Sequence, residues 1–217
     1  MKMIAINGSP RRNKNTATLL QSALDGAKMQ GAETELINLY DLNYKGCISC
    51  FACKLKNGKN RGKCSYQDDL TPVLDKILSA DALLLGSPIY FESVTGEMRS
   101  FLERLLFPIL EYTEGYPSIL KKKIPTGFIY TMNVTKEYME SANYIQALQF
   151  MENDLSRLLG DCESMTANDT LQFPDYSKYV VTVFDEDHKK QVHETQFPND
   201  RQKAYNLGAN LIEKARQ

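Results

Sequence analysis

The chain is poor in histidine and has no long apolar run. Its two histidines, His188 and His193, both lie in the charged segment FDEDHKKQVHE. A segment of this kind is typical of a solvated loop or helix, so we expect no site built on histidine, the side chain that titrates near neutral pH. No stretch approaches the roughly 18 apolar residues of a membrane-spanning helix. The first residues also lack the apolar core of a signal peptide, and the protein is therefore expected to be soluble and cytoplasmic.

Net charge is almost absent. The 26 lysines and arginines balance 27 aspartates and glutamates, which leaves a formal net charge of −1. Such a balance creates no global field that would attract the chain to nucleic acid or to an anionic membrane surface. We therefore expect a small molecule or another protein as partner, and neither nucleic acid nor a membrane.

Two common phosphate-binding motifs are missing as well. Neither G-x-x-x-x-G-K-[ST] nor G-x-G-x-x-G occurs, which excludes a nucleotide P-loop and a dinucleotide fingerprint. The segment NGSPRRNKNT at residues 7–16 nevertheless has the residue types that hold an anion. A glycine permits a tight turn, hydroxyl side chains and arginines offer hydrogen bonds and charge, and the helix that follows presents unpaired backbone N–H groups. An ordinary polar turn with a threonine cap is the alternative.

Strand-like apolar runs alternate with helix-like runs along the chain, which is typical of an α/β domain. Five strands are predicted, at residues 3–7, 34–40, 81–90 and 126–133 and within 162–173. Helices are predicted from residue 16, after a cap at Asp68 or Asp69, at 98–109, at 144–159, and from a cap at Asp200 to residue 215. The pattern predicts a single domain over residues 1–217, built on a doubly wound parallel sheet with helices on both faces. In such sheets ligands bind outside the carboxyl ends of the strands.

The segment GSPIYFESVTGEMRSFLERL, at residues 86–105, follows the third predicted strand and reaches the same edge of the sheet as residues 7–16. Pro88 makes its backbone rigid, and Tyr90 and Phe91 offer flat apolar surface for a ring. Backbone amides there can meet the polar edge of such a ring. The alternative is a turn that caps the core with its aromatic side chains packed inward.

Four of the five cysteines fall in an insertion at about residues 46–66, as C-x2-C-x2-C followed by a fourth cysteine after ten residues. Thiols stay reduced in the cytosol, where clustered cysteines bind metal or do redox chemistry more often than they form structural disulfides. An iron–sulfur cluster, a structural zinc, a redox thiol or disulfide pair, and a metal-free loop with small, partly buried residues are four interpretations of this pattern. The fifth cysteine, Cys162, is expected in the core.

These segments resemble the flavodoxin-like NAD(P)H-dependent FMN reductases and, within them, the iron–sulfur flavoproteins. The resemblance rests on GSPRRNKNT at residues 8–16, the cysteine segment ending in GKCSYQDD, residues 86–105, and TGFIYTMN at residues 126–133. It implies a flavodoxin-like sheet of five parallel strands in the order 2-1-3-4-5, which places the first and third strands at the switch point. It also implies a homodimer or higher oligomer, in which an aromatic connection with Tyr112 and Tyr116 could cover the partner's site.

The resemblance further implies FMN as cofactor. The residues that would hold its phosphate are Ser9, Arg11, Asn13, Asn15 and Thr16. Those that would border the ribityl chain and the ring are Pro88, Ile89, Tyr90, Phe91 and Ser93, with Thr131, Met132 and Asn133 on another side. No catalytic side chain is expected, because the flavin itself would carry electrons from NAD(P)H to a quinone, free flavin or other small acceptor.

Two other functions remain open from the sequence. The chain could be an electron carrier between protein partners, using FMN and a four-iron cluster on Cys47, Cys50, Cys53 and Cys64. Iron–sulfur flavoproteins usually have the fourth cysteine nearer the third, but a longer loop closes at small entropic cost. The chain could also be a binding module for another phosphate-bearing ligand.

Overall fold

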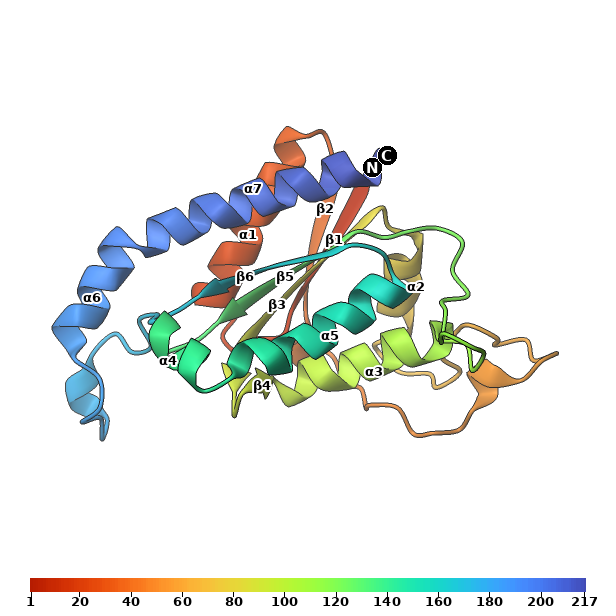
Figure 1. Ribbon diagram of the computed structural model, residues 1–217, viewed down its shortest axis with the longest axis horizontal. Helices are drawn as coiled ribbons and strands as arrows, with labels where there is room; N and C mark the ends of the chain where they lie inside the picture. Colours follow the sequence, from red (N-terminus) through yellow and green to blue (C-terminus); the bar gives the residue numbers. More distant parts are fainter.

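The computed structural model describes residues 1–217 and has one parallel sheet at its centre (Figure 1). The sheet consists of β1 (Lys2–Asn7), β2 (Glu33–Asn38), β3 (Ala82–Tyr90), β5 (Thr126–Thr131) and β6 (Cys162–Ala167). Their order is β2-β1-β3-β5-β6, and every neighbouring pair is parallel. This is the predicted order 2-1-3-4-5, with an additional short strand, β4 (Ser93–Val94), antiparallel to the end of β3.

Helices cover both faces of the sheet, as the sequence predicts. One face carries α1 (Asn15–Met29) and α7 (Phe197–Ala215), and the other carries α2 (Thr71–Ser79), α3 (Gly96–Ile109) and α5 (Tyr144–Leu158) (Figure 1). Short helices lie in the connections: α4 (Lys136–Ser141), α6 (Glu186–Thr195), and the 3₁₀ turns η1 (Leu39–Asp41), η2 (Ala52–Lys54) and η3 (Tyr176–Lys178). None of the helices combines the length and the apolar character that crossing a bilayer requires.

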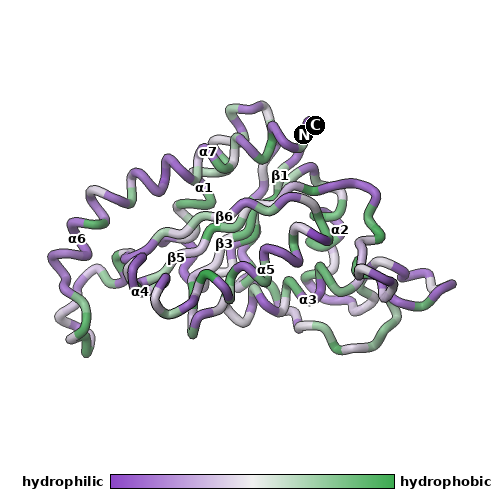
Figure 2. The backbone as a smooth tube through the Cα atoms, in the orientation of Figure 1, coloured by the Kyte–Doolittle hydropathy of each residue, from purple (hydrophilic) through white to green (hydrophobic).

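The central strands are buried on both faces, which explains their apolar sequences. In β1, Met3 and Ala5 pack in the hydrophobic cluster beneath α1 and α7, whereas Ile4 and Ile6 pack in the larger cluster beneath α2, α3 and α5. Figure 2 shows the apolar colour concentrated along the central strands and the polar colour along α6 and the outer side of α7. The alternation of side chains along a strand thus divides one apolar run between two cores.

Two predicted helix caps are wrong. Helix α7 begins at Phe197, so Asp200 lies inside its first turn, where the carboxylate accepts a hydrogen bond from Gln196 Nε2 at 2.8 Å. Helix α2 follows Leu70 without a side-chain cap. Asp68 Oδ1 instead accepts a hydrogen bond from the Leu70 amide at 3.1 Å, and the carboxylate also pairs with the buried Arg104. This tertiary contact competes with helix capping for the carboxylate.

Candidate flavin pocket and cysteine segment

A cavity of about 150 Å³, lined mostly by polar residues, opens at the carboxyl ends of β1, β3 and β5. Loops from each of these strands contribute to its wall, together with the segment that follows β6. The lining residues are Ser9, Arg11, Lys14, Asn15, Thr16, Pro88, Ile89, Tyr90, Thr131, Met132, Asn133, Thr170 and Gln172. The cavity lies at the switch point between β1 and β3, where open α/β sheets bind their ligands.

Ten of the thirteen residues predicted for the cofactor line this cavity. The three that do not are Asn13, Phe91 and Ser93, all exposed to solvent. Phe91 has a positive φ of 50° and its side chain is 97 % exposed, so its ring does not cap the core. Lys14, Thr170 and Gln172 also line the cavity but are not predicted from the sequence, because the segment after β6 that carries the last two has no recognisable motif.

The first loop turns sharply because β1 and β3 approach each other closely at their ends. The Gly8 amide donates to the Gly86 carbonyl at 2.8 Å, and Thr95 Oγ1 donates to the Gly8 carbonyl at 2.8 Å. A Cβ atom on Gly8 would lie 2.9 Å from the end of Met98 and 3.2 Å from the Gly86 oxygen. A side chain here would crowd both Met98 of α3 and the end of β3, which favours glycine.

Helix α1 starts at the cavity with no side chain capping its N-terminus. The unpaired amides of its first turn give that end a partial positive charge. Thr16 is buried, and its hydroxyl lies 2.8 Å from Thr131 Oγ1 on β5. Arg11 bonds the Gln172 carbonyl through its guanidinium at 2.7 Å, and its backbone amide donates to Ser9 Oγ at 3.1 Å. This end of the cavity is suited to an anion.

Another part of the cavity wall contains a hydrogen-bond acceptor without a partner. Asn133 donates through Nδ2 to Gln172 Oε1 at 3.0 Å, whereas its Oδ1 is buried and makes no hydrogen bond. A buried polar atom without a partner lowers stability unless a ligand or water satisfies it. Together with the α1 terminus, this atom fits a ligand that has both an anionic group and hydrogen-bond donors, and FMN meets both requirements.

The four clustered cysteines line one small hollow beside α3. Cys47, Cys50, Cys53 and Cys64 all contribute to a cavity of about 20 Å³. All are free thiols, and no group of three or more Cys, His, Asp or Glu side chains is arranged to hold a metal. The donor set nevertheless fits a four-iron cluster in kind and number, since such clusters take four thiolates.

Two of these thiols have different surroundings. A hydrogen bond with Ser65 Oγ and backbone amides lowers the pKa of Cys50, which is exposed. Burial raises the pKa of Cys53, the most enclosed of the four. The fifth cysteine, Cys162, opens β6 and packs at the edge of the core, where burial raises its pKa to about 12. The raised pKa favours the protonated thiol of Cys162 at neutral pH.

Helix α3 supports the cysteine segment along its length. Tyr44 donates its hydroxyl to the Glu97 carbonyl at 2.6 Å, and the Cys47 amide donates to Glu103 Oε2 at 3.3 Å. Lys54 donates to backbone carbonyls at the end of the helix, among them that of Phe107. The segment is thus bound to one helix at several successive turns.

Comparison with known proteins identifies the family. The family model for NADPH-dependent FMN reductases matches residues 1–125, more than half of the chain. The chain belongs to this family. Ten of the residues that the sequence resemblance implies for the cofactor line the cavity described above. The parallel sheet with helices on both faces is the flavodoxin-like fold that the resemblance implied.

Several curated proteins that match this chain are named iron–sulfur flavoproteins. It is 40% identical over 104 residues to iron-sulfur flavoprotein MJ1083 of Methanocaldococcus jannaschii, a match that covers 48% of this chain and 51% of that protein. An iron-sulfur flavoprotein of Archaeoglobus fulgidus is 41% identical over 104 residues, with 48% of each chain covered. The matches thus span about half the length of these curated relatives.

Solved structures share the fold over nearly the whole chain. The NAD(P)H:quinone oxidoreductase from Methanothermobacter marburgensis has a TM-score of 0.71 at 15% identity, and 98% of this chain and 97% of that chain are covered. The azoreductase from Bacillus anthracis str. Sterne has a TM-score of 0.65 at 13% identity, with coverage of 97% and 99%. At these identities the likeness concerns the fold alone.

Proposed function

We propose that the chain binds FMN in the cavity between β1, β3 and β5 and transfers electrons from NAD(P)H to a small acceptor such as a quinone or a free flavin. The observation that carries the proposal is the convergence of ten predicted cofactor residues, from three separate strand ends, on one cavity. Bound FMN would supply the hydride and electron chemistry. The residues of the chain bind it and orient it.

The anion-binding end of the cavity is assigned to the FMN phosphate. Arg11 supplies a positive charge, and Ser9 and Thr16 supply hydroxyl groups beside the uncapped start of α1. The hydrogen bond between Thr16 and Thr131 fixes the Thr16 hydroxyl between the first loop and β5. Charge-assisted hydrogen bonds of this type are roughly twice as strong as neutral ones, so this end contributes much of the affinity.

The remaining wall is assigned to the ribityl chain and the ring. The unpaired Oδ1 of Asn133 would accept a hydrogen bond from a donor on the cofactor. Pro88 and Ile89 give a rigid, apolar edge, and Tyr90 is half exposed at the mouth of the cavity. Since the cavity opens to solvent, a nicotinamide and a small electron acceptor would both have access to bound FMN.

Substitution of Thr16 tests the phosphate assignment. Thr16→Val keeps the shape of the side chain but removes the hydroxyl, and we expect the Kd for FMN to rise about tenfold, the equivalent of one hydrogen bond to a charged group. Thr18→Val, two residues after Thr16 on α1 and outside the cavity lining, is the matched control and should keep the wild-type Kd. Quenching of flavin fluorescence measures both. Equal affinities in the two variants would show that this loop does not hold the phosphate.

A second candidate function is that of an iron–sulfur flavoprotein that carries electrons between protein partners. It is favoured by the four cysteines around one hollow and by the names of the curated relatives. The test is an absorption spectrum of anaerobically purified protein, with iron, zinc and sulfide assayed on the same sample. A cluster predicts about four iron per chain. Flavin bands without iron would favour the reductase with free thiols.

The double variant Cys50→Ser, Cys53→Ser locates the cluster. If the cysteine segment holds it, iron and sulfide should fall to background while FMN content stays at the wild-type level, because the flavin cavity shares no residue with this segment. Cys162→Ser is the control and should keep full iron. Wild-type iron content in the double variant would contradict the assignment.

A further inference from the structure

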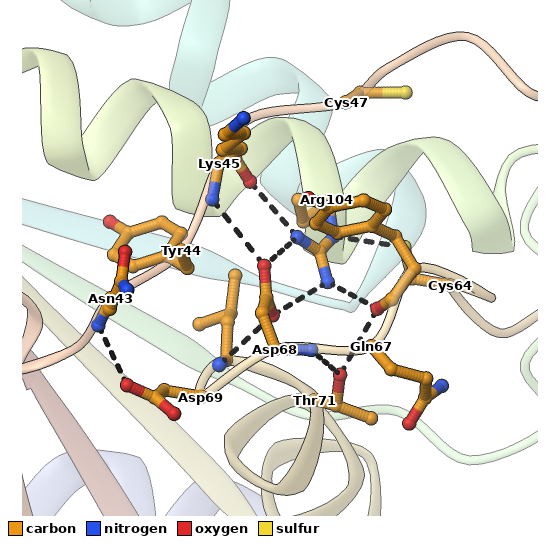
Figure 3. Close-up of polar contacts among 12 residues, drawn as sticks. Asn43, Tyr44, Lys45, Cys47, Cys64, Gln67, Asp68, Asp69, Thr71 and Arg104 are labelled. Atoms are coloured by element: carbon orange, nitrogen blue, oxygen red, sulfur yellow. Dashed lines mark hydrogen bonds and ion pairs between the residues drawn. The ribbon is translucent and has the colours of Figure 1, made fainter.

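Arg104 is a buried arginine whose five N–H donors all have partners. Its side chain is 1% exposed on α3. Nε donates to Cys64 Sγ at 2.9 Å, and Nη1 donates to the Lys45 carbonyl at 2.9 Å and to Asp68 Oδ2 at 2.8 Å. Nη2 donates to the Tyr66 carbonyl at 2.8 Å and to Asp68 Oδ1 at 3.1 Å. Figure 3 shows the guanidinium at the centre of this network.

The partners of Arg104 come from both ends of the cysteine segment. Lys45 lies two residues before the first cysteine of the cluster, whereas Cys64, Tyr66 and Asp68 lie at its far end. A single side chain of α3 therefore joins the two ends of a long loop (Figure 3). Closing such a loop has an entropic cost, which these hydrogen bonds offset.

The network is not explained by packing. A buried ion pair gives little net stability compared with apolar side chains of the same volume. Arg104 also has no part in the flavin cavity. The ion pair between Arg104 and Asp68 instead fixes the orientation of both side chains. The planar guanidinium holds Asp68 through two parallel hydrogen bonds and points Nε at the sulfur of Cys64.

We propose that Arg104, held by Asp68, is a positioning residue for the cysteine segment. It keeps the two ends of the segment together and directs an N–H donor at Cys64, one of the four sulfur ligands assigned to the cluster. This inference rests on the proposed iron–sulfur function. Hydrogen bonds to cluster sulfurs help to set the reduction potential, and groups that orient ligands contribute strongly to metal retention.

The test compares Arg104→Gln and Arg104→Lys with Arg99→Gln, an exposed arginine on the same helix. After anaerobic reconstitution, we expect both Arg104 variants to bind FMN normally but to retain iron about 10- to 100-fold less well against a chelator. The lysine in Arg104→Lys should not restore iron retention, since it keeps the positive charge without the planar set of N–H donors. The cluster that remains should have a lower reduction potential and an altered electron paramagnetic resonance spectrum. Arg99→Gln should match the wild type.

Wild-type iron retention and potential in both Arg104 variants would overturn the proposal. If Arg104→Gln does not fold, as shown by lost FMN binding, Arg104→Lys, which keeps a buried charge beside Asp68, is judged alone and should show the same loss of iron. A wild-type protein that takes up no iron overturns the cluster assignment separately. The positioning role of Arg104 is then judged by hydrogen exchange over residues 45–66: faster exchange in Arg104→Lys than in Arg99→Gln supports this role, and equal exchange rejects it.

Discussion

Asp68 holds the buried Arg104, the side chain that joins the two ends of the cysteine segment. Its side chain is 11% exposed and faces Arg104. Burial favours a higher pKa, but the hydrogen bonds and charge of Arg104 outweigh it and hold the pKa of Asp68 below its usual value. Since the folded pKa is lowered, the stabilisation is present above the unfolded pKa of about 3.9 and is lost as the pH falls through the folded pKa.

Asp68→Asn should therefore destabilise the protein in a pH-dependent way. At pH 7 we expect a loss of about 3–5 kcal/mol, because Arg104 would remain buried without its counter-charge. The difference from the wild type should begin to shrink as the pH falls below about 4, where Asp68 of the unfolded chain becomes protonated, and should shrink further as the pH falls through the lower pKa of folded Asp68. Urea unfolding at several pH values measures it. Asp75→Asn removes an exposed pair with Lys63 and should cost less than about 1 kcal/mol at any pH.

Residues next to strand ends could be predicted from the sequence, whereas residues brought in by distant segments could not. Ser9 and Pro88 follow apolar runs directly, so the switch-point rule places them at one edge of the sheet. Gln172 reaches the same cavity from a segment after β6 that has no motif. Arg104 lies within an apolar helical stripe, and its link to Cys64 depends on a fold of the loop that spacing alone does not specify.

At the level of elements, α1 and α7 cross with their backbones in contact. A Cβ atom on Gly208 would lie 1.8 Å from the Ala23 carbonyl oxygen, and one on Gly26 would lie 2.0 Å from that of Tyr205. The two glycines permit this approach. Because α1 begins at the flavin cavity, the crossing also sets the direction in which its first amides point.

Gly208→Ala should destabilise the protein by about 1–3 kcal/mol through overpacking, although alanine is the better helix former by about 1 kcal/mol. Gly96→Ala at the start of α3 is the matched control, since nothing lies within 4 Å of the added Cβ, and it should change stability by less than about 0.5 kcal/mol. Chemical denaturation of both variants gives the comparison. A stabilised Gly208→Ala would show that the helices do not cross this closely.

The long elements agree with the sequence pattern because burial on one or both faces dictates their periodicity. The short ones were missed. Strand β4 has two residues and α4 has six, too few for a periodic signal. The start of α7 was placed too late because α7 begins at Phe197 directly after α6, with Pro198 in its first turn and no side-chain cap to mark the boundary.

At the scale of the whole molecule, α3 joins the two candidate sites. It begins at Gly96, just after the loop that borders the flavin cavity, and carries Arg104 beside the cysteines. With a rise of 1.5 Å per residue, these two positions lie about 12 Å apart along the helix. A change in the cysteine segment can therefore be transmitted to the flavin loop through one rigid element, and the Arg104 variants should be examined for flavin potential as well.

Thermal unfolding with FMN and with riboflavin tests the site in the intact chain. At free FMN 100 times above Kd, binding should stabilise the protein by about 2.7 kcal/mol and raise Tm by about 5–10 °C. Riboflavin lacks the phosphate, and the loss of two charge-assisted hydrogen bonds weakens its binding by about 100-fold or more. At the same concentration it should stabilise by about 0.4 kcal/mol at most, a shift near 1 °C.

The two flavins together decide which end of the cavity is correctly assigned. A large shift with FMN alone supports the phosphate role of residues 8–16. Equal shifts with both flavins would mean that the ring binds but that the loop does not hold the phosphate. Inorganic phosphate added with riboflavin is the control for a general anion effect. No shift with either flavin would reject the flavin pocket itself, since a ligand that binds the native state must raise Tm.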